Sequence, residues 1–451
     1  MRQDARGNPI GTASDAALAA AERALWRMMS FFEPPVADLD AAIAEDPAWL
    51  LPRVMKAGFL LSLTEPALVD EAARLLDDAE PMGPHAPARE RVHLAATRLV
   101  LEGRWHDACR AWEALLVDHP RDALALQWAH LWDFYRGDAA QLRLRPARAL
   151  PEWDEDDALF PYVLGLFAFG LEECNLYPQA EEAGRRATAG PARVPWAVHA
   201  VAHAMEMQGR FEDGAAWLRQ QQPQWSSDDN GFAGHLWWHL GLFRIEGLDA
   251  PGVLRLLDAH LSGPALQITL QRLDAASLLW RLQLLGEDVS AQFRALVDAW
   301  PFDGAHAGHY AFNDLHAVVA LAGAGELARA DAWIARCAGR ALDPADARRA
   351  NHAMAREIGL PLMRGVLAHA RGDHDAAAEL MQPARALAQR FGGSHAQRDL
   401  IDQTLMAACA LGRRHRALGR ALVNERLMAK PATPLTRFWS QRLGVCAAWP
   451  A

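Results

Sequence analysis

LEGRWHDACRAWEALLVDHP, residues 101–120, contains small and helix-breaking residues in an order that predicts a helical hairpin. Gly103 is followed after five positions by the small residue Ala108 and after seventeen by Pro120. A glycine can end one helix, and a small residue lets the next helix pack closely against it. A proline then stops that second helix. The stretch therefore predicts the turn and the second helix of an antiparallel pair.

The same turn recurs along the chain at a nearly constant spacing. The next one lies at Gly137, 34 residues after Gly103, and 34 residues is the period of tetratricopeptide repeats. Seven later turns, spaced by 34 to 47 residues, lie at Asn175, Gly209, Gly247, Gly286, Gly325, Gly372 and Gly412. The pattern predicts an array of about nine degenerate hairpins, with insertions where the hairpins join.

The rest of the sequence predicts an all-α fold. Apolar residues recur at i, i+3 and i+4 through most of the chain, and runs of β-branched residues are short. The first helices of the hairpins are expected near 123–136, 157–174, 195–208, 230–246, 267–285, 309–323, 350–370 and 393–411. Before the hairpins we expect helices near 13–31, 36–45, 49–62 and 66–79. We interpret residues 1–451 as one solenoid, with atypical N-terminal helices in 1–86, repeats in 87–427 and a C-terminal cap in 428–451.

Charge and cysteine content limit the function classes. The 46 Lys and Arg and 56 Asp and Glu give a formal net charge of −10, which argues against duplex nucleic-acid binding. The sequence has no run of about 18 apolar residues and no readable secretory signal, so we expect no membrane span. The five cysteines (Cys109, Cys174, Cys337, Cys409 and Cys446) form no CxxC pair. They indicate neither a disulfide framework nor a thiolate zinc site and favour a cytoplasmic location.

Histidines and carboxylates interrupt the apolar faces of several first helices. In such arrays the first helix of each hairpin lines the inner surface. VHAVAHAMEM places His199, His203 and Glu206 on one stripe, at i, i+4 and i+7. GHLWWHLGLF, in the next hairpin, places His235 and His239 at i, i+4. Further polar candidates on first helices are His130, Glu172, Asn313, Asp314, His316, Arg398 and Asp399.

The histidine pairs have an ordinary explanation and three functional ones. A single histidine on an apolar helix is usually a hydrogen-bonded core residue, although two HxxxH pairs in consecutive hairpins weaken that explanation. Two histidines at i, i+4 can bind one zinc ion, but no HExxH motif is present, and whether a metal binds stays open. General acid–base chemistry is a second option. Recognition of a polar ligand by hydrogen bonds is the third.

Several blocks in order resemble the tetratricopeptide repeat protein 38 family. They are ARERVHLAA, FGLEECNLYPQAE, VHAVAHAMEM, HLWWHLGLF, FNDLHAVVAL, IGLPL and GGSHAQRDL, and the likeness runs almost from end to end. The resemblance implies an all-α superhelical solenoid and little about activity. The blocks carry most of the candidate residues above, including His199, His203, His235, His239 and His316.

We expect the solenoid to bind a small polar molecule or a short peptide end in a central, His-rich pocket. The histidines at 199, 203, 235, 239 and 316 should then face one shared cavity. The first alternative is an enzyme, a hydrolase or lyase with or without metal, whose cofactors are unknown. In it His203 or His239 acts as acid–base, oriented by Asp314 or Glu206. The second alternative is a protein-interaction scaffold, and a homo-oligomer is compatible with the sequence.

Overall fold

The computed structural model describes residues 2–445, so Cys446 and the end of the predicted cap 428–451 lie outside the described residues. Every named element between residues 2 and 445 is a helix. Extended backbone is limited there to two isolated bridges, Gln3 with Pro9 and Phe32 with Asn230. The all-α prediction is confirmed, because the 3.6-residue apolar period that suggested it is a local property of each segment.

The chain divides into two compact units, and each is described by itself below. The first contains Met1–Val201, Pro223–Ala233 and Arg348–Ala350, and the second contains Ala202–Gln222, Gly234–Ala347 and Asn351–Ala451. Helix α11 (Pro195–Met207) begins in the first unit and ends in the second. The single continuous array expected from the sequence stays a prediction.

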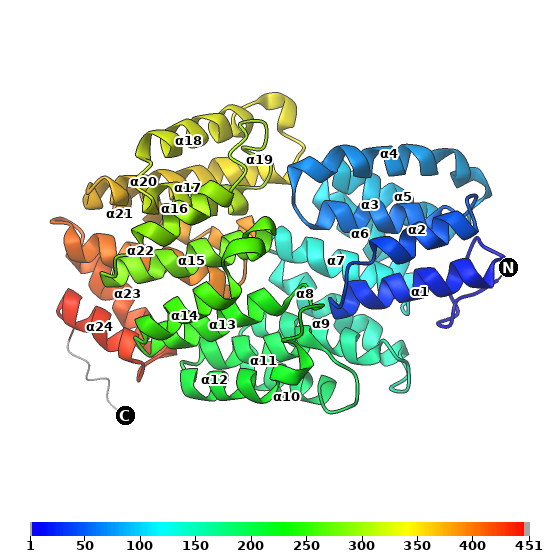
Figure 1. Ribbon diagram of the computed structural model, residues 1–451, viewed down its shortest axis with the longest axis horizontal. Coiled ribbons are helices and arrows are strands. Elements are labelled where there is room, and N and C mark those ends of the chain that lie inside the picture. Colours follow the sequence, from blue (N-terminus) through cyan, green and yellow to red (C-terminus); the bar gives the residue numbers. More distant parts are fainter. Residues whose placement is uncertain (1, 446–451) are drawn as a thin grey trace. The chain divides into compact units, whose positions relative to one another are not determined.

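The first unit consists of antiparallel helices in chain order. They are α1 (Asp15–Ser30), α2 (Val36–Glu45), α3 (Leu51–Ser62), α4 (Val69–Ala79), α5 (Ala88–Leu101), α6 (Trp105–Asp118), α7 (Ala123–Tyr135), α8 (Ala139–Ala149), α9 (Phe160–Glu173) and α10 (Tyr177–Ala187). Successive pairs such as α3 with α4 and α5 with α6 pack side by side (Figure 1). The four helices predicted before the hairpins agree with α1 to α4.

The second unit continues the same pattern after α11. Its helices are α12 (Phe211–Gln220), α13 (Ala233–Glu246), α14 (Ala250–His260), α15 (Thr269–Leu285), α16 (Ser290–Ala299), α17 (Ala311–Gly323), α18 (Leu327–Ala341), α20 (Leu360–Ala370), α21 (His374–Arg385), α22 (His395–Leu411), α23 (Arg416–Ala429) and α24 (Pro434–Leu443). The short helix α19 (Ala350–Met354) and a π-helical turn, Ala355–Gly359, precede α20. The helix predicted at 350–370 is therefore interrupted by this turn.

A helix ends at each of the nine predicted turns, but two turns differ in detail. At the fifth turn Leu248, not Gly247, takes the left-handed conformation, with φ of 57°. Gly412 has an extended conformation, with φ of −73° and ψ of 171°. The sequence pattern located these turns correctly, whereas the conformation of each residue depends on how the preceding helix ends.

Four first helices of the second unit surround part of its interior. Helix α15 contacts α17, α17 contacts α20, α20 contacts α22, and α22 contacts α15 again (Figure 1). The second helices α16, α18, α21 and α23 each pack against the first helix of their own hairpin. Polar residues on the inner sides of α15, α17 and α22 are therefore enclosed by neighbouring helices, as their burial shows.

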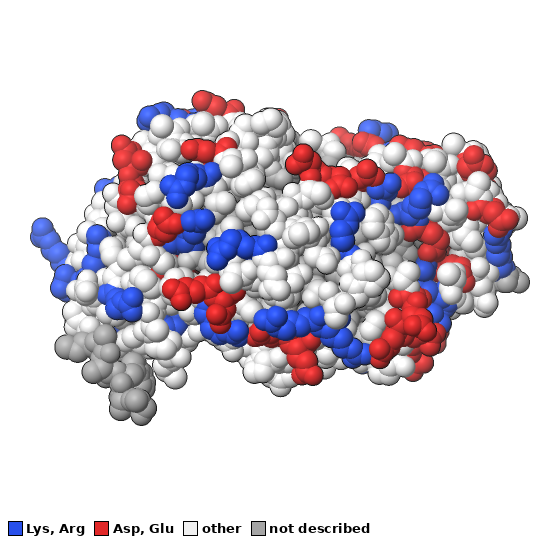
Figure 2. All heavy atoms as spheres, turned by 60° about the horizontal axis from the view of Figure 1, so that its bottom comes forward, with Lys and Arg blue, Asp and Glu red and all other residues white. Residues whose placement is uncertain are grey.

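Two further observations concern the described part of the chain. None of its helices combines the length and the apolar character that crossing a lipid bilayer requires. On the face in Figure 2, basic and acidic side chains are interspersed over the surface. That face has no continuous basic stripe of the kind that duplex nucleic-acid binders use.

Candidate functional site

Three of the predicted histidines meet in the interior of the second unit. His203 comes from α11, and His235 and His239 stand one turn apart on α13. The ring centroids of His203 and His239 are 4.4 Å apart, and those of His235 and His239 are 4.9 Å apart. All three side chains are buried. We call these three residues the histidine cluster.

Two buried carboxylates hold the Nδ1 atoms of the histidine cluster. His235 Nδ1 lies 2.9 Å from Asp274 Oδ2, and His239 Nδ1 lies 3.2 Å from Glu206 Oε2. Desolvation by burial raises the pKa of Asp274, and it raises the pKa of Glu206 to about 8. Burial, together with the neighbouring imidazoles, lowers the pKa of His239 well below its ordinary value. His239 is therefore a neutral imidazole at neutral pH.

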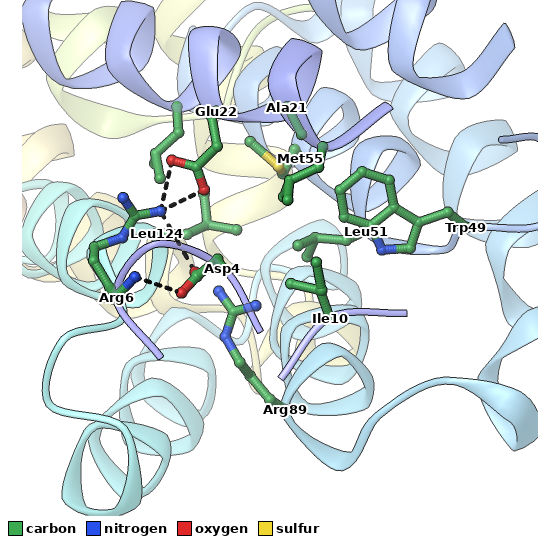
Figure 3. A pocket seen from close by; sticks show the side chains of 12 residues that line it. Asp4, Arg6, Ile10, Ala21, Glu22, Trp49, Leu51, Met55, Arg89 and Leu124 are labelled. Atoms are coloured by element: carbon green, nitrogen blue, oxygen red, sulfur yellow. Dashed lines mark hydrogen bonds and ion pairs between the residues drawn. The ribbon is translucent and has the colours of Figure 1, made fainter. Parts of the chain in front are cut away.

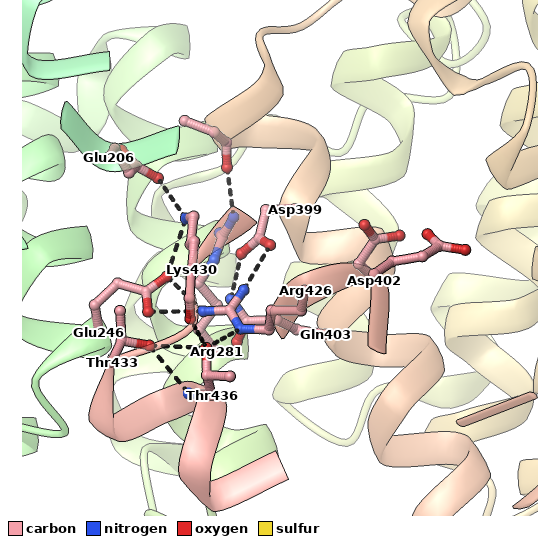
Figure 4. Close-up of polar contacts among 12 residues, drawn as sticks. Glu206, Glu246, Arg281, Asp399, Asp402, Gln403, Arg426, Lys430, Thr433 and Thr436 are labelled. Atoms are coloured by element: carbon pink, nitrogen blue, oxygen red, sulfur yellow. Dashed lines mark hydrogen bonds and ion pairs between the residues drawn. The ribbon is translucent and has the colours of Figure 1, made fainter. Parts of the chain in front are cut away.

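A network of charged side chains lies beside Glu206 and includes Glu246, the last residue of α13 (Figure 4). Arg426 donates two hydrogen bonds to the carboxylate of Glu246, at 2.5 and 2.7 Å, and one to Asp399 Oδ1 at 3.2 Å. Lys430 Nζ lies 3.0 Å from Glu246 and 4.0 Å from Glu206. Burial opposes the ionisation of Asp399, but Arg426, Lys430 and Arg281 outweigh it and lower its pKa to about 2.

Arg281, on α15, differs from Arg426 and Lys430 because it has no carboxylate partner within the described residues. Its guanidinium donates to the backbone oxygens of Ser277, at 3.1 Å, and Ala396, at 2.8 Å. Its Nε has no hydrogen-bond acceptor, and no carboxylate oxygen within 4.0 Å pairs with it in the described part of the chain. The side chain is 1% exposed, and burial lowers its pKa.

The positive charge of Arg281 lowers the pKa of histidines on two helices, α13 and α17. It is one cause of the lowered pKa of His239 and of His316, after desolvation, and the pKa of His316 is about 4. The guanidinium carbon also lies 6.0 Å from the ring centroid of Trp238. Arg281 is therefore a buried cation with neutral imidazoles and an aromatic face in its surroundings.

The remaining candidates of the second unit lie in other surroundings. His316 Nδ1 bonds to the carbonyl oxygen of Phe312 at 2.9 Å, and its ring packs against the Phe312 ring with centroids 4.6 Å apart. Asp314 Oδ1 accepts hydrogen bonds from Gly308 N and Trp333 Nε1, both at 3.1 Å, so it does not orient a histidine. Arg398 donates to the carbonyl oxygen of Gly393, and Asn313 is half-buried.

The first unit holds His130, Glu172 and His199. The ring of His199 stacks on Phe169, with centroids 5.3 Å apart, and meets the edge of Phe232 at 5.1 Å. His130 contacts Phe169, and neither of its ring nitrogens has a hydrogen-bond partner in the described structure. Burial lowers the pKa of His130 to about 3. Glu172, on α9, is buried.

A small cavity in the first unit lies apart from all of the predicted residues. Arg6 lies between Asp4 and Glu22 at its edge, with an Nη2–Oε1 distance of 2.6 Å to Glu22 (Figure 3). Trp49 and Arg89 line the same cavity. Its volume of about 20 Å³ leaves room for little more than a water molecule. It is too small for a metabolite.

The sequence interpretation missed five charged residues of the second unit. These are Glu246, Asp274, Arg281, Arg426 and Lys430. Asp274 and Arg281 stand seven positions apart in the apolar stretch of the predicted helix 267–285, so the signal that identified the histidines could have identified them. Arg426 and Lys430 lie in and just after a second helix, α23, where charged residues usually face solvent.

The second unit thus joins the histidine cluster, its two carboxylates and an unpaired guanidinium in one buried region. These groups can bind an anion, hold a metal ion or exchange protons. No protein-family model matches the chain.

Proposed function

We propose that this protein binds a small polar molecule, or a short peptide end, whose anionic group pairs with Arg281 inside the second unit. The observation that carries the proposal is the buried guanidinium without a carboxylate. Burying an unpaired charge costs several kcal/mol, and natural cores avoid it unless the charge serves a purpose. A carboxylate or phosphate is the partner whose geometry fits a guanidinium, through paired N–H donors.

The surroundings of Arg281 support a small ligand. The neighbouring carboxylates Glu246 and Asp399 are already neutralised by Arg426 and Lys430. Arg281 acts on Asp399 only beyond ion-pair distance, and its Nε–H has no acceptor within the described residues, so a partner from outside the chain can pair with it. Buried imidazoles can donate hydrogen bonds to the polar part of the same molecule or accept hydrogen bonds from it.

We also propose the finer architecture that the sequence suggested. The hairpins stack as in a tetratricopeptide-repeat solenoid, and the chain is a cytoplasmic member of the protein 38 family that it resembles. The support is the helix end at each of nine turns. The order of the family-like blocks points the same way.

The test begins with the purified full chain. Small molecules that accompany it are extracted and identified by mass spectrometry, and each is titrated back by calorimetry beside phosphate, succinate and dialanine. At least one anionic compound should bind, and its neutral amide should bind far more weakly. Arg281→Gln should weaken binding by about 10- to 100-fold, the worth of a charge-assisted hydrogen bond.

Arg272→Gln is the matched control, because Arg272 is a buried arginine on the same helix that bonds to Leu266 O and Thr269. It should leave the affinity unchanged. Equal binding by wild type and Arg281→Gln would overturn the proposal. Conversion of the bound compound into a product would establish the enzyme alternative at the same site.

A further inference from the structure

The histidine cluster has the composition and spacing of a metal site. One ligand atom from each of His203, His235 and His239 lies within 4.8 Å of the others. Two nitrogens that bind one tetrahedral zinc ion at 2.0–2.1 Å are about 3.4 Å apart. The three ligand atoms, at most 4.8 Å apart, therefore lie close to the spacing that one bound ion requires.

The hydrogen bond between His235 and Asp274 prepares one of these rings for a metal. Asp274 accepts a bond from His235 Nδ1 at 2.9 Å, and Glu206 lies 3.2 Å from His239 Nδ1. A carboxylate that accepts from Nδ1, as Asp274 does from His235, keeps the proton on that atom, so the lone pair of that ring is on Nε2. Metal-binding histidines in proteins almost always have such a partner, which fixes the tautomer and the ring orientation.

The segment of α15 that carries Asp274 is tied to α13 by a hydrogen bond. Asp274 stands on α15, one turn before Ser277, whose hydroxyl accepts a bond from Trp238 Nε1 at 2.6 Å. The Ser277 hydroxyl also donates to the backbone oxygen of Asp274 at 3.0 Å. The two supporting carboxylates therefore come from helices, Asp274 from α15 and Glu206 from α11, and not from loops.

We propose that His203, His235 and His239 together bind one divalent transition-metal ion of the zinc class. Three imidazole nitrogens suit zinc, copper, nickel and iron and are poor ligands for magnesium or calcium. The inference goes beyond the proposed anion site, because it depends on none of the contacts of Arg281.

The test uses the full-length chain with any affinity tag removed. The protein is stripped with a chelator and titrated with zinc chloride and, in a second series, with cobalt chloride, whose visible absorption reports the ligand geometry. Elemental analysis should give one ion per chain, and the cobalt spectrum should be that of a four-coordinate site. His235→Gln and His239→Gln should each weaken binding by about 100-fold or more, since each removes a ligand.

Asp274→Asn tests the supporting carboxylate without touching a ligand. It should weaken metal binding by about 10- to 100-fold, the usual effect of losing such a partner. His93→Gln is the matched control, because His93 in the first unit is also a buried histidine bonded to a carboxylate, Asp122, at 2.9 Å. It should leave the affinity unchanged, and circular dichroism checks that each variant is folded.

The failure of the wild-type chain to bind zinc or cobalt at micromolar concentration would overturn the inference. The same conclusion would follow if His93→Gln weakened binding as much as His239→Gln. Should a histidine variant fail to fold, the wild-type cobalt spectrum and Asp274→Asn still decide the matter. Anion binding at Arg281 is measured separately, so the two proposals fail independently.

Discussion

At the scale of single residues, the second unit contains two buried arginines in opposite situations. Arg426 is paired with Glu246 and Asp399, whereas Arg281 bonds only to backbone oxygens. Removing one partner of a buried ion pair leaves an uncompensated charge and destabilises the protein. Removing an unpaired buried charge instead removes the desolvation free energy that the charge cost on folding. The two arginines should therefore respond in opposite directions to the same substitution.

We expect Arg426→Met to lower the free energy of unfolding by about 3–5 kcal/mol, because Glu246 and Asp399 lose their main cation. Arg281→Met should raise it by about 1 kcal/mol in the absence of ligand, since the buried charge disappears. Urea denaturation at neutral pH measures both. A large loss of stability in Arg281→Met would show that this guanidinium is structural and would argue against its role in binding.

At the scale of elements, two glycines can show how far a turn between helices depends on the left-handed backbone conformation. Gly372 lies in the turn just after α20 with φ of 80°, and an added Cβ would meet nothing within 4 Å. Gly339 is an exposed residue inside α18, and its Cβ would also meet nothing within 4 Å. Packing is thus equal at the two sites, and only the backbone conformation differs.

Gly372→Ala should destabilise the protein by about 1 kcal/mol, because a side chain is strained in the left-handed region. Gly339→Ala should stabilise it by about 0.5–1 kcal/mol, because alanine favours the helix. Thermal and urea unfolding of the two variants give the comparison. Equal effects of both substitutions would contradict the assignment of Gly372 as a turn residue.

At the scale of the whole molecule, buried histidines control the stability in acid. Burial lowers the pKa of His130 to about 3 and the pKa values of His316 and His369 to about 4. The unfolded chain binds these protons near pH 6.5, so below that value it holds more protons than the native state. Each such histidine therefore contributes stability that is lost as the pH falls toward its native pKa.

Carboxylates whose pKa is raised oppose this loss of stability only at higher pH. Asp314, with a pKa of about 6, takes up its proton in the native state first, so its effect ends near the unfolded value of about 4. Asp399, with a pKa of about 2, adds to the loss below pH 4, because the unfolded chain protonates it earlier. From pH 4 to pH 3 the contributions of His130 and Asp399 have the same sign.

We therefore expect the free energy of unfolding to fall steadily from pH 4 to pH 3. His130→Phe should make this fall shallower, because a phenylalanine beside Phe169 and Trp196 has no proton to gain. Urea denaturation of both proteins at intervals across this range provides the measurement. Parallel curves for the two proteins would show that His130 is not held neutral in the native state.

The sequence by itself determined the helices, the places where they end and the interruption of their apolar faces by histidines. Gly103, Gly137 and Asn175 mark turns because a helix end depends on a few neighbouring residues. His235 and His239 share one helix face because the helix period places i and i+4 together. The left-handed residue at Leu248 escaped the pattern, since leucine has no preference for that conformation.

Only the tertiary structure decided which polar residues meet. His235 and Asp274 are 39 positions apart, and Arg426 and Glu246 are 180 positions apart, so no local pattern pairs them. Asp314 and His316 are near neighbours in sequence, yet Asp314 bonds to Trp333 and His316 bonds to Phe312. The physical reason is that helix periodicity fixes the direction of a side chain, whereas its partner depends on which helices pack against that face.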